Sequence, residues 1–167
     1  MRTLLLASLL ICAALAGCTK RRVITAAPPA NTLVEGTVIK GPGHWTHTDG
    51  RRTHALTITH SGKDVEWFYE YPNPGGSGGG GASMTAATPF PWFFYVESPL
   101  RIWIFDGAGG LSCQTNSSAG SIETEDAISD GKLQDDSGKV PPEVVPLLPA
   151  ELQKLFPAKA SKPRPSI

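Results

Sequence analysis

The sequence predicts an all-β domain: a mostly antiparallel sandwich or partly open barrel of six or seven strands, with a short C-terminal helix. In residues 33–71 and 89–115, the residue pattern repeats with a period of two, which is typical of strands. Asp-Gly, glycine and proline segments separate these runs, as in sheets built from hairpins. Eleven of the thirteen aromatic residues lie between Trp67 and Phe105, which is typical of a small β core. An aromatic surface for sugars is the alternative interpretation.

The chain begins with a segment typical of a secretory signal. Arg2 precedes an apolar run of twelve residues, Leu4–Leu15, which is followed by small residues and Cys18. A helix that spans a bilayer needs roughly 20 apolar residues. The sequence therefore predicts a signal peptide rather than a permanent membrane span.

The residues Leu15-Ala16-Gly17-Cys18 resemble the lipobox of bacterial lipoproteins. The resemblance covers only the first eighteen residues and implies cleavage before Cys18, which would carry a thioether-linked diacylglyceryl group and an N-acyl chain. Two or more chains anchor a protein stably, since each buried methylene contributes about 0.8 kcal/mol. Thr19 is not the aspartate associated with inner-membrane retention. The resemblance thus implies a lipid-anchored envelope protein, with outer-membrane attachment and the domain in the periplasm, if the host has two membranes.

Composition divides the mature chain into a tether, a β domain and a C-terminal addition. Pro28-Pro29 lies in a stretch with little to bury, and residues 71–83 are of low complexity. The predicted divisions are a signal peptide (1–17), lipidated Cys18 with a flexible tether (18–32), a β domain (33–115) with a glycine-rich loop (72–88), an acidic loop region (116–140), a short C-terminal helix packed on the sheet (141–157) and a disordered tail (158–167).

Two hairpins organise the predicted β domain. Asp49-Gly50 suits a two-residue turn between alternating runs, and Ser98-Pro99-Leu100 connects two apolar runs. In the second hairpin the predicted cross-strand pairs are Glu97 with Arg101, Tyr95 with Trp103, Phe93 with Phe105, and Val96 with Ile102. Both faces of this hairpin are apolar, so it is expected in the centre of the sheet or between two layers. In the preceding run, one face carries Val65, Trp67, Tyr69 and Tyr71.

The C-terminal third is expected to be loop followed by helix. Residues 122–139 contain six acidic residues and two lysines, with a spacing that does not match an EF-hand loop. Pro149 and Glu151 mark a helix start. One side of that helix carries Leu152, Leu155 and Phe156, which we expect to dock on the sheet. A partner-binding helix that uses these three residues is the alternative.

All four histidines lie in residues 44–60 and raise the question of a metal site. His54 and His60 share a face but lie six residues apart, about 20 Å along a strand. If Asp49-Gly50 forms the turn, Trp45 pairs with His54, and His47 becomes a diagonal neighbour of His54 at roughly 7–8 Å. Structural zinc takes about four ligands and catalytic zinc about three. A zinc or copper site at His47 and His54 is therefore kept only as an alternative.

The catalytic patterns of the chain lack their structural context. Residues 75–79 match GxSxG, and Gly76, Gly78 and Gly81 match GxGxxG, but both fall inside one glycine run with no strand-to-helix turn. Cys113 is the one thiol expected to remain free, and a buried apolar role is favoured for it. We expect no enzyme and no cofactor beyond the lipid on Cys18.

Charge excludes one class of partner. Without residues 1–17 the chain loses Arg2 and keeps 14 Lys+Arg against 15 Asp+Glu, so no net field recruits nucleic acid. The sequence predicts a non-catalytic binding or structural lipoprotein whose tether reaches an envelope protein or a cell-wall component. A metal-binding lipoprotein is the first alternative, and an envelope hydrolase is the less favoured second.

Overall fold

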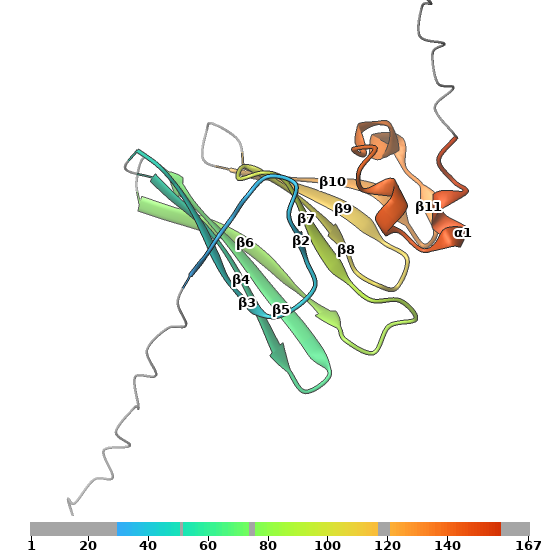
Figure 1. Cartoon of the computed structure of the whole chain (residues 1–167), viewed down its shortest axis with the longest axis horizontal. Coiled ribbons are helices and arrows are strands. Elements are labelled where there is room, and N and C mark those ends of the chain that lie inside the picture. The colour runs from blue at the N-terminus through green and yellow to red at the C-terminus, as the bar shows by residue number, and fades with distance from the viewer. Residues whose placement is uncertain (1–29, 51, 74–75, 117–120, 158–167) are drawn as a thin grey trace, which may run out of the picture.

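The computed structural model describes residues 30–50, 52–73, 76–116 and 121–157 (Figure 1). Two β-sheets face each other, and a C-terminal segment covers the far side of the second sheet (Figure 1). This confirms the predicted sandwich of mostly antiparallel strands with a short C-terminal helix, and the sheets do not close into a barrel. The signal peptide, Cys18, most of the tether and the tail lie outside the described residues.

The first sheet, sheet A, contains five strands in the order β1-β3-β4-β5-β6. Their bounds are β1 Asn31–Thr32, β3 Gly43–Asp49, β4 Arg52–Ser61, β5 Asp64–Asn73 and β6 Gly76–Thr85. β1 pairs parallel with β3, and the other neighbours are antiparallel. The predicted tether therefore ends two residues earlier than expected, because Asn31 and Thr32 already join the sheet.

The second sheet, sheet B, contains six strands in the order β11-β10-β9-β8-β7-β2. Their bounds are β2 Val38–Ile39, β7 Phe93–Ser98, β8 Arg101–Phe105, β9 Leu111–Asn116, β10 Ile122–Ser129 and β11 Lys132–Leu133. All its pairs are antiparallel. The described residues thus form eleven strands, more than the expected six or seven, and β1, β2 and β11 have two residues each.

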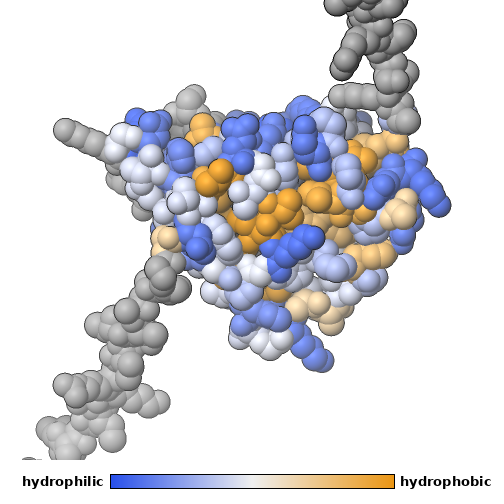
Figure 2. Space-filling view, viewed as in Figure 1, coloured by the Kyte–Doolittle hydropathy of each residue, from blue (hydrophilic) through white to orange (hydrophobic). Residues whose placement is uncertain are grey.

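The main core fills the space between the two sheets. Sheet A contributes Leu56, Ile58, Val65, Trp67 and Tyr69, and sheet B contributes Phe94, Val96, Ile102 and Ile104. The rings of Trp67 and Phe94 meet edge to face, with 6.0 Å between their centroids. Each fully buried side chain of this size contributes about 1.5–3 kcal/mol, so this interface holds the sheets together. In Figure 2, hydrophobic residues gather in the middle of the face shown, with hydrophilic residues around them.

A second core lies on the other face of sheet B. It contains Phe93, Tyr95, Trp103, Phe105, Leu111 and Cys113 of the sheet, with Val144, Leu148 and Leu152 of the C-terminal segment. That segment consists of η1 Asp135–Lys139, η2 Val145–Leu147 and α1 Ala150–Gln153. Sheet B is therefore covered on both faces, as the two apolar faces of its central hairpin predict. Among the described residues, no helix has the length and apolar character needed to cross a membrane.

The hairpin of β7 and β8 has the predicted register except at its turn. Phe93 pairs with Phe105, Tyr95 with Trp103, and Val96 with Ile102. Beyond these pairs the register shifts, so Ser98 rather than Glu97 faces Arg101. The displaced Glu97 still binds Arg101, with 2.9 Å between Oε2 and Nε.

The glycine-rich stretch is a strand, so the expectation of a flexible loop over residues 72–88 is wrong. β6 pairs with β5 along its whole length, from Asn73 opposite Gly76 to Asp64 opposite Thr85. Aromatic rings of β5 cover glycines of β6 that have no side chain of their own: Tyr71 lies over Gly78 and Phe68 over Gly79. Such rings stabilise glycine at a sheet edge by replacing the missing side-chain contacts.

The acidic stretch is also partly a strand, which corrects the expected loop over residues 116–140. β10 pairs with β9, and a bulge between Asp126 and Ile128 buries Ala127 and Ile128 in the second core. Glu125 is held by two cations, at 2.8 Å from Arg101 and 2.5 Å from Lys139. These two apolar residues and the ion pairs outweigh the low strand propensity of an acidic sequence.

Candidate binding cleft

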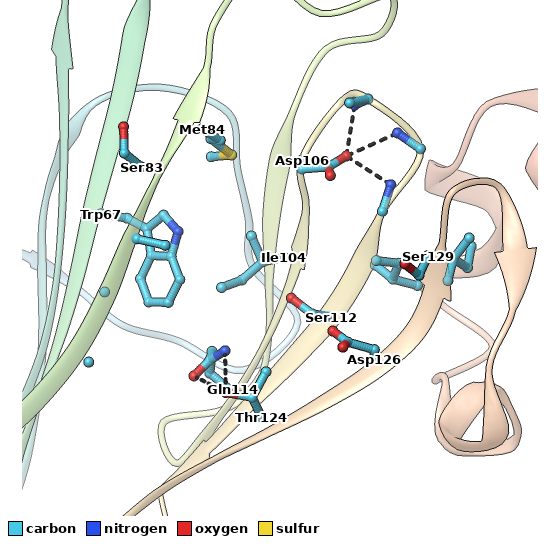
Figure 3. A pocket seen from close by; sticks show the side chains of 18 of the residues that line it. Trp67, Ser83, Met84, Ile104, Asp106, Ser112, Gln114, Thr124, Asp126 and Ser129 are labelled. Atoms are coloured by element: carbon cyan, nitrogen blue, oxygen red, sulfur yellow. Dashed lines mark hydrogen bonds between the residues drawn. The ribbon is translucent and has the colours of Figure 1, made fainter.

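A cleft opens between the two sheets along β6 (Figure 3). Its volume is about 660 Å³, and it lies between β6 of sheet A and strands β8, β9 and β10 of sheet B. Trp67 and Met84 line it from sheet A, and Ile104, Ser112, Gln114 and Asp126 line it from sheet B. This is the size range of sites that hold small molecules or short polymer segments.

The cleft lies where β6 supplies several small residues and β9 and β10 supply several polar ones. On sheet A, the residues of β6 that face sheet B include Gly80 and Ala82, which are small. On sheet B, the inner face changes from the apolar side chains of β7 and β8 to polar ones on β9 and β10. Ile122 closes one part of the gap, since its Cδ1 lies 2.8 Å from where a Cβ of Gly80 would stand. The remaining space is open, and polar and apolar groups line it in about equal measure.

Two side chains on the floor of the cleft hold each other in place. Gln114 Nε2 donates to Thr124 Oγ1 at 3.0 Å, and Thr124 Oγ1 donates to Gln114 Oε1 at 3.2 Å. Gln114 is buried, whereas Thr124 is exposed. A buried amide that is fixed by a neighbouring strand presents its polar atoms in one orientation, which is what selective hydrogen bonding to a ligand requires.

The charges of the cleft have one sign. Its lining includes three carboxylates, Asp106, Asp126 and Asp130, and no lysine, arginine or histidine. Asp106 is occupied by the β8–β9 turn, because its Oδ1 accepts from three backbone N–H groups, those of Ala108 (2.7 Å), Gly109 (3.0 Å) and Gly110 (2.9 Å). Asp126 and Asp130 are exposed. The cleft therefore disfavours anionic ligands and suits neutral or cationic ones.

The lining offers hydroxyl, amide, carboxylate and apolar groups. Its serines, Ser83, Ser112 and Ser129, have no histidine or lysine among the lining residues to act as a base. Ser77 of the GxSxG pattern belongs to β6 rather than to a strand-to-helix turn. These side chains can form hydrogen bonds and apolar contacts with a ligand.

His47 and His54 lie closer together than the sequence predicts. His47 lies directly opposite His54, with ring centroids 6.4 Å apart, so the diagonal arrangement is wrong. The reason is the turn: Asp49 pairs with Arg52, so Asp49 belongs to β3 and not to the turn, which contains Gly50 with φ 59°. Gly50 tolerates the positive φ that this turn demands.

His54 is a buried polar group at one end of the main core. Asn116 Nδ2 donates to its Nδ1 at 3.3 Å, and Tyr69 stacks on its ring with 6.5 Å between centroids. Burial lowers the pKa of His54, and the nearby His47 lowers it further. Within the described ranges, no three histidine, cysteine or acidic residues come together as a metal site. His47 and His54 therefore form a pair without a third ligand from the described residues.

The stability of the domain is expected to fall as the pH drops below about 6.5. The folded protein favours neutral His54, whereas the unfolded chain protonates it near the ordinary pKa of 6.5. Unfolding therefore takes up a proton. The free energy of unfolding falls by at most about 1.4 kcal/mol for each pH unit below this value. Urea unfolding of wild type, His54→Gln and the exposed-site control His60→Gln at about pH 7.5 and about pH 5.5 measures this. An equal loss of stability in all three proteins would assign the effect to other groups.

Cys113 is a buried thiol rather than a reactive one. It lies in the second core with no exposed surface, and burial raises its pKa to about 11. Since the thiolate is the nucleophile, native Cys113 should react with a disulfide reagent at about pH 8 roughly a hundredfold or more slowly than in urea. A chain from residue 18 with Cys18→Ser has Cys113 as its one thiol. Equal rates in the native and unfolded chains would contradict this burial.

The remaining predicted residues have places within the domain. Leu152 is buried, and Leu155 and Phe156 are partly buried against the second core. A partner could reach these three residues only by displacing the C-terminal segment from sheet B. His44 Nδ1 lies 2.9 Å from Thr57 Oγ1, and His60 is exposed near the end of β4.

The sequence motifs do not single out the residues of the cleft. One signal was present: Ser112, Gln114 and Asn116 place three polar side chains on one face of a strand whose other face is largely apolar. A polar inner face beside a glycine strand indicates an unfilled gap between sheets.

Comparisons with family models, with curated proteins and with solved structures give no match. A functional proposal therefore rests on the sequence and structure of the chain itself.

Proposed function

We propose that this protein is a lipid-anchored binding protein of the bacterial cell envelope, and that the cleft between its sheets is the binding site. The observation that carries the binding role is the open cleft of about 660 Å³, whose polar floor is ordered by the Gln114–Thr124 hydrogen bonds. The Leu15–Cys18 lipobox supports the anchor and the envelope location. The attachment is to the outer membrane, with the domain in the periplasm, where an envelope protein or a cell-wall component is within reach.

The length of the segment after Cys18 sets how far the domain can stand from the membrane in the proposed arrangement. Twelve residues, 19–30, separate Cys18 from β1. Fully extended, they span about 40 Å. That distance lets the cleft meet a partner that lies away from the lipid surface.

Metabolic labelling tests the anchor. Cells that express the chain are fed labelled palmitate, and we expect label in the protein and recovery of the protein in the membrane fraction. Cys18→Ser should abolish both, whereas Cys113→Ala, a change at the other cysteine of the mature chain, should leave the label. Labelling that survives Cys18→Ser would overturn the lipid-anchor proposal.

Site-directed cross-linking tests the cleft. A photo-reactive side chain is placed at exposed Asp130 on the rim of the cleft, and, as the matched control, at exposed Glu66 on the outer face of sheet A. Illumination of living cells should give a discrete adduct from position 130 and none from position 66. Equal adducts from both positions, or none from the cleft, would contradict a binding role for the cleft.

Metal binding by the histidine pair is the second candidate. The observation in its favour is the direct pairing of His47 with His54. The test is the metal content of the tag-free protein, followed by zinc and copper titration of wild type and His47→Ala. Stoichiometric metal that disappears in the variant would establish the site, and an empty protein with only millimolar affinity would eliminate it.

A further inference from the structure

β6 is a long strand with a free edge. It is the last strand of sheet A, and no strand within the described ranges pairs with its other side. The other three sheet edges end in two-residue strands, β1, β2 and β11, whereas β6 has ten residues. A long unpaired edge presents a row of backbone N–H and C=O groups that can receive another chain.

The direction of these groups follows from the ladder between β5 and β6. Ala86 N–H donates to the Lys63 carbonyl at 2.6 Å, which makes this position a hydrogen-bonded pair. Hydrogen-bonded and non-hydrogen-bonded pairs alternate in an antiparallel ladder. The even-numbered residues of β6 therefore bond to β5, and the odd-numbered ones direct their backbone groups to the free edge. These include Gly79, Gly81 and Ser83.

Within its described residues, β6 carries no lysine, proline or bulge to guard its edge against another strand. Natural sheets guard long edges with lysine, proline, bulges or a covering segment. The stretch Gly76–Thr85 has no charged residue and no proline, and its pairing with β5 runs without a register shift. At Gly79 and Gly81 there is also no side chain of β6 beside the exposed groups.

We propose that β6 binds an extended polypeptide by strand addition, with alternate side chains of that peptide entering the cleft and basic residues favoured there. This inference rests on the proposed function, because it uses the same cleft and specifies its ligand. An added strand lies about 4.8 Å beyond β6 and continues sheet A across the mouth of the cleft.

The chemistry of the cleft selects the side chains of the peptide. Every second side chain of the added strand lies on the face of Gly80, Ala82 and Met84, opposite β9 and β10. There it meets the exposed carboxylates of Asp126 and Asp130, with no cation in the lining. Lysine or arginine at alternate positions therefore complements the cleft, and backbone pairing supplies affinity that is independent of sequence.

The test uses synthetic peptides and the full mature protein in detergent. The probe is a fluorescent ten-residue peptide of alternating lysine and valine, and the matched peptides carry glutamate for lysine or a central proline. We expect the lysine peptide to bind at least about tenfold more tightly than either control. Hydrogen exchange of the complex should slow at the amides of Gly79, Gly81 and Ser83.

A backbone variant tests strand addition directly. Ser83→Pro removes one N–H from the free edge, and since that N–H is not bonded to β5 the change suits an edge strand. It should weaken the lysine peptide about tenfold. Ser83→Ala keeps the N–H and removes only a hydroxyl group of the cleft lining, so it should lose clearly less affinity than Ser83→Pro. Asp126→Asn should reduce the preference for lysine over glutamate.

Several outcomes would overturn strand addition. These are equal binding by Ser83→Pro and wild type, exchange protection away from β6, or binding of a cell-wall glycan fragment with no peptide affinity. If Ser83→Pro does not fold, the exchange pattern of the wild-type complex decides alone. In each of these cases, a discrete cross-link from position 130 would still support the cleft as a binding site. The absence of that cross-link would contradict both the binding role of the cleft and strand addition.

Discussion

Replacing Trp103 with alanine is expected to lower the free energy of unfolding by about 3–5 kcal/mol. Trp103 is fully buried in the second core, where it pairs with Tyr95 on one side and Cys113 on the other. Its removal leaves a cavity between sheet B and the C-terminal segment. Sheet B and the C-terminal segment both pack in this core, so neither can move far enough to fill the cavity.

The polar contacts of Trp103 add to this loss. Its Nε1 donates to Glu97 Oε2 at 2.6 Å, and the guanidinium of Arg101 lies 5.5 Å from the centre of the ring. Arg101 also binds Glu97 and Glu125, so Trp103 contacts two members of an ion-pair network. A cation over an indole ring contributes about 0.5–1 kcal/mol at a partly exposed site.

Urea unfolding measures the effect of Trp103→Ala. Leu100→Ala, at an exposed position in the adjacent turn, is the control and should change stability by less than about 1 kcal/mol. Trp103→Phe should recover part of the loss, because it refills most of the cavity. A Trp103→Ala protein within about 1 kcal/mol of wild type would show that the second core does not depend on this residue.

Replacing Gly81 with alanine is expected to cost about 2–3 kcal/mol, although it adds a single methyl group. A Cβ at this position would overlap the backbone carbonyl oxygen of Trp67 on β5. That atom belongs to the ladder between β5 and β6, so it cannot move without breaking strand pairing. The substitution should therefore loosen β6 as well as destabilise the domain.

Two matched glycines make this prediction specific. Gly138 has nothing within 4 Å of a Cβ and no positive φ, so Gly138→Ala should leave stability nearly unchanged. At Gly79 the obstacle is the end of the exposed Phe68 ring, which can rotate away, so the cost should be intermediate. Urea unfolding together with hydrogen exchange of β6 gives the order. Equal tolerance of alanine at all three positions is the result expected of a flexible loop, and it would contradict the strand.

The sequence predicts elements well where a strand carries its own pattern. The hairpin of β7 and β8 has alternating aromatic and aliphatic residues on both faces, and its sandwiched position and most of its register follow from them. β6 lacks such a pattern, because its packing comes from Phe68 and Tyr71 on the neighbouring strand. Low complexity alone therefore predicts a flexible loop where the structure has a strand.

The candidate site was harder to predict because it arises between strands that are distant in the sequence. Gln114 and Thr124 meet only because β9 and β10 pair, and both face β6 only because the sheets stack. Which residue lies opposite His54 depends on the position of the turn, since a shift by one residue changes every cross-strand pair. Composition does not determine that position, because Asp49-Gly50 and the two residues that begin with Gly50 both suit a tight turn. Cys18 is a different case, because a motif of adjacent residues needs no tertiary contact to be identified.

The chain enters sheet A at β1, at the opposite edge from β6. Tension on the N-terminal segment therefore reaches the fold through a parallel pair of two residues, extended by the hydrogen bond from Leu33 N–H to the Thr46 carbonyl at 2.7 Å. The ladder between β3 and β4 has seven pairs, and the one between β5 and β6 has ten. Under a pulling force β1 should detach first. This would lengthen the segment between Cys18 and the domain by a few residues, while the far edge of the sheet and the cleft beside it keep their shape.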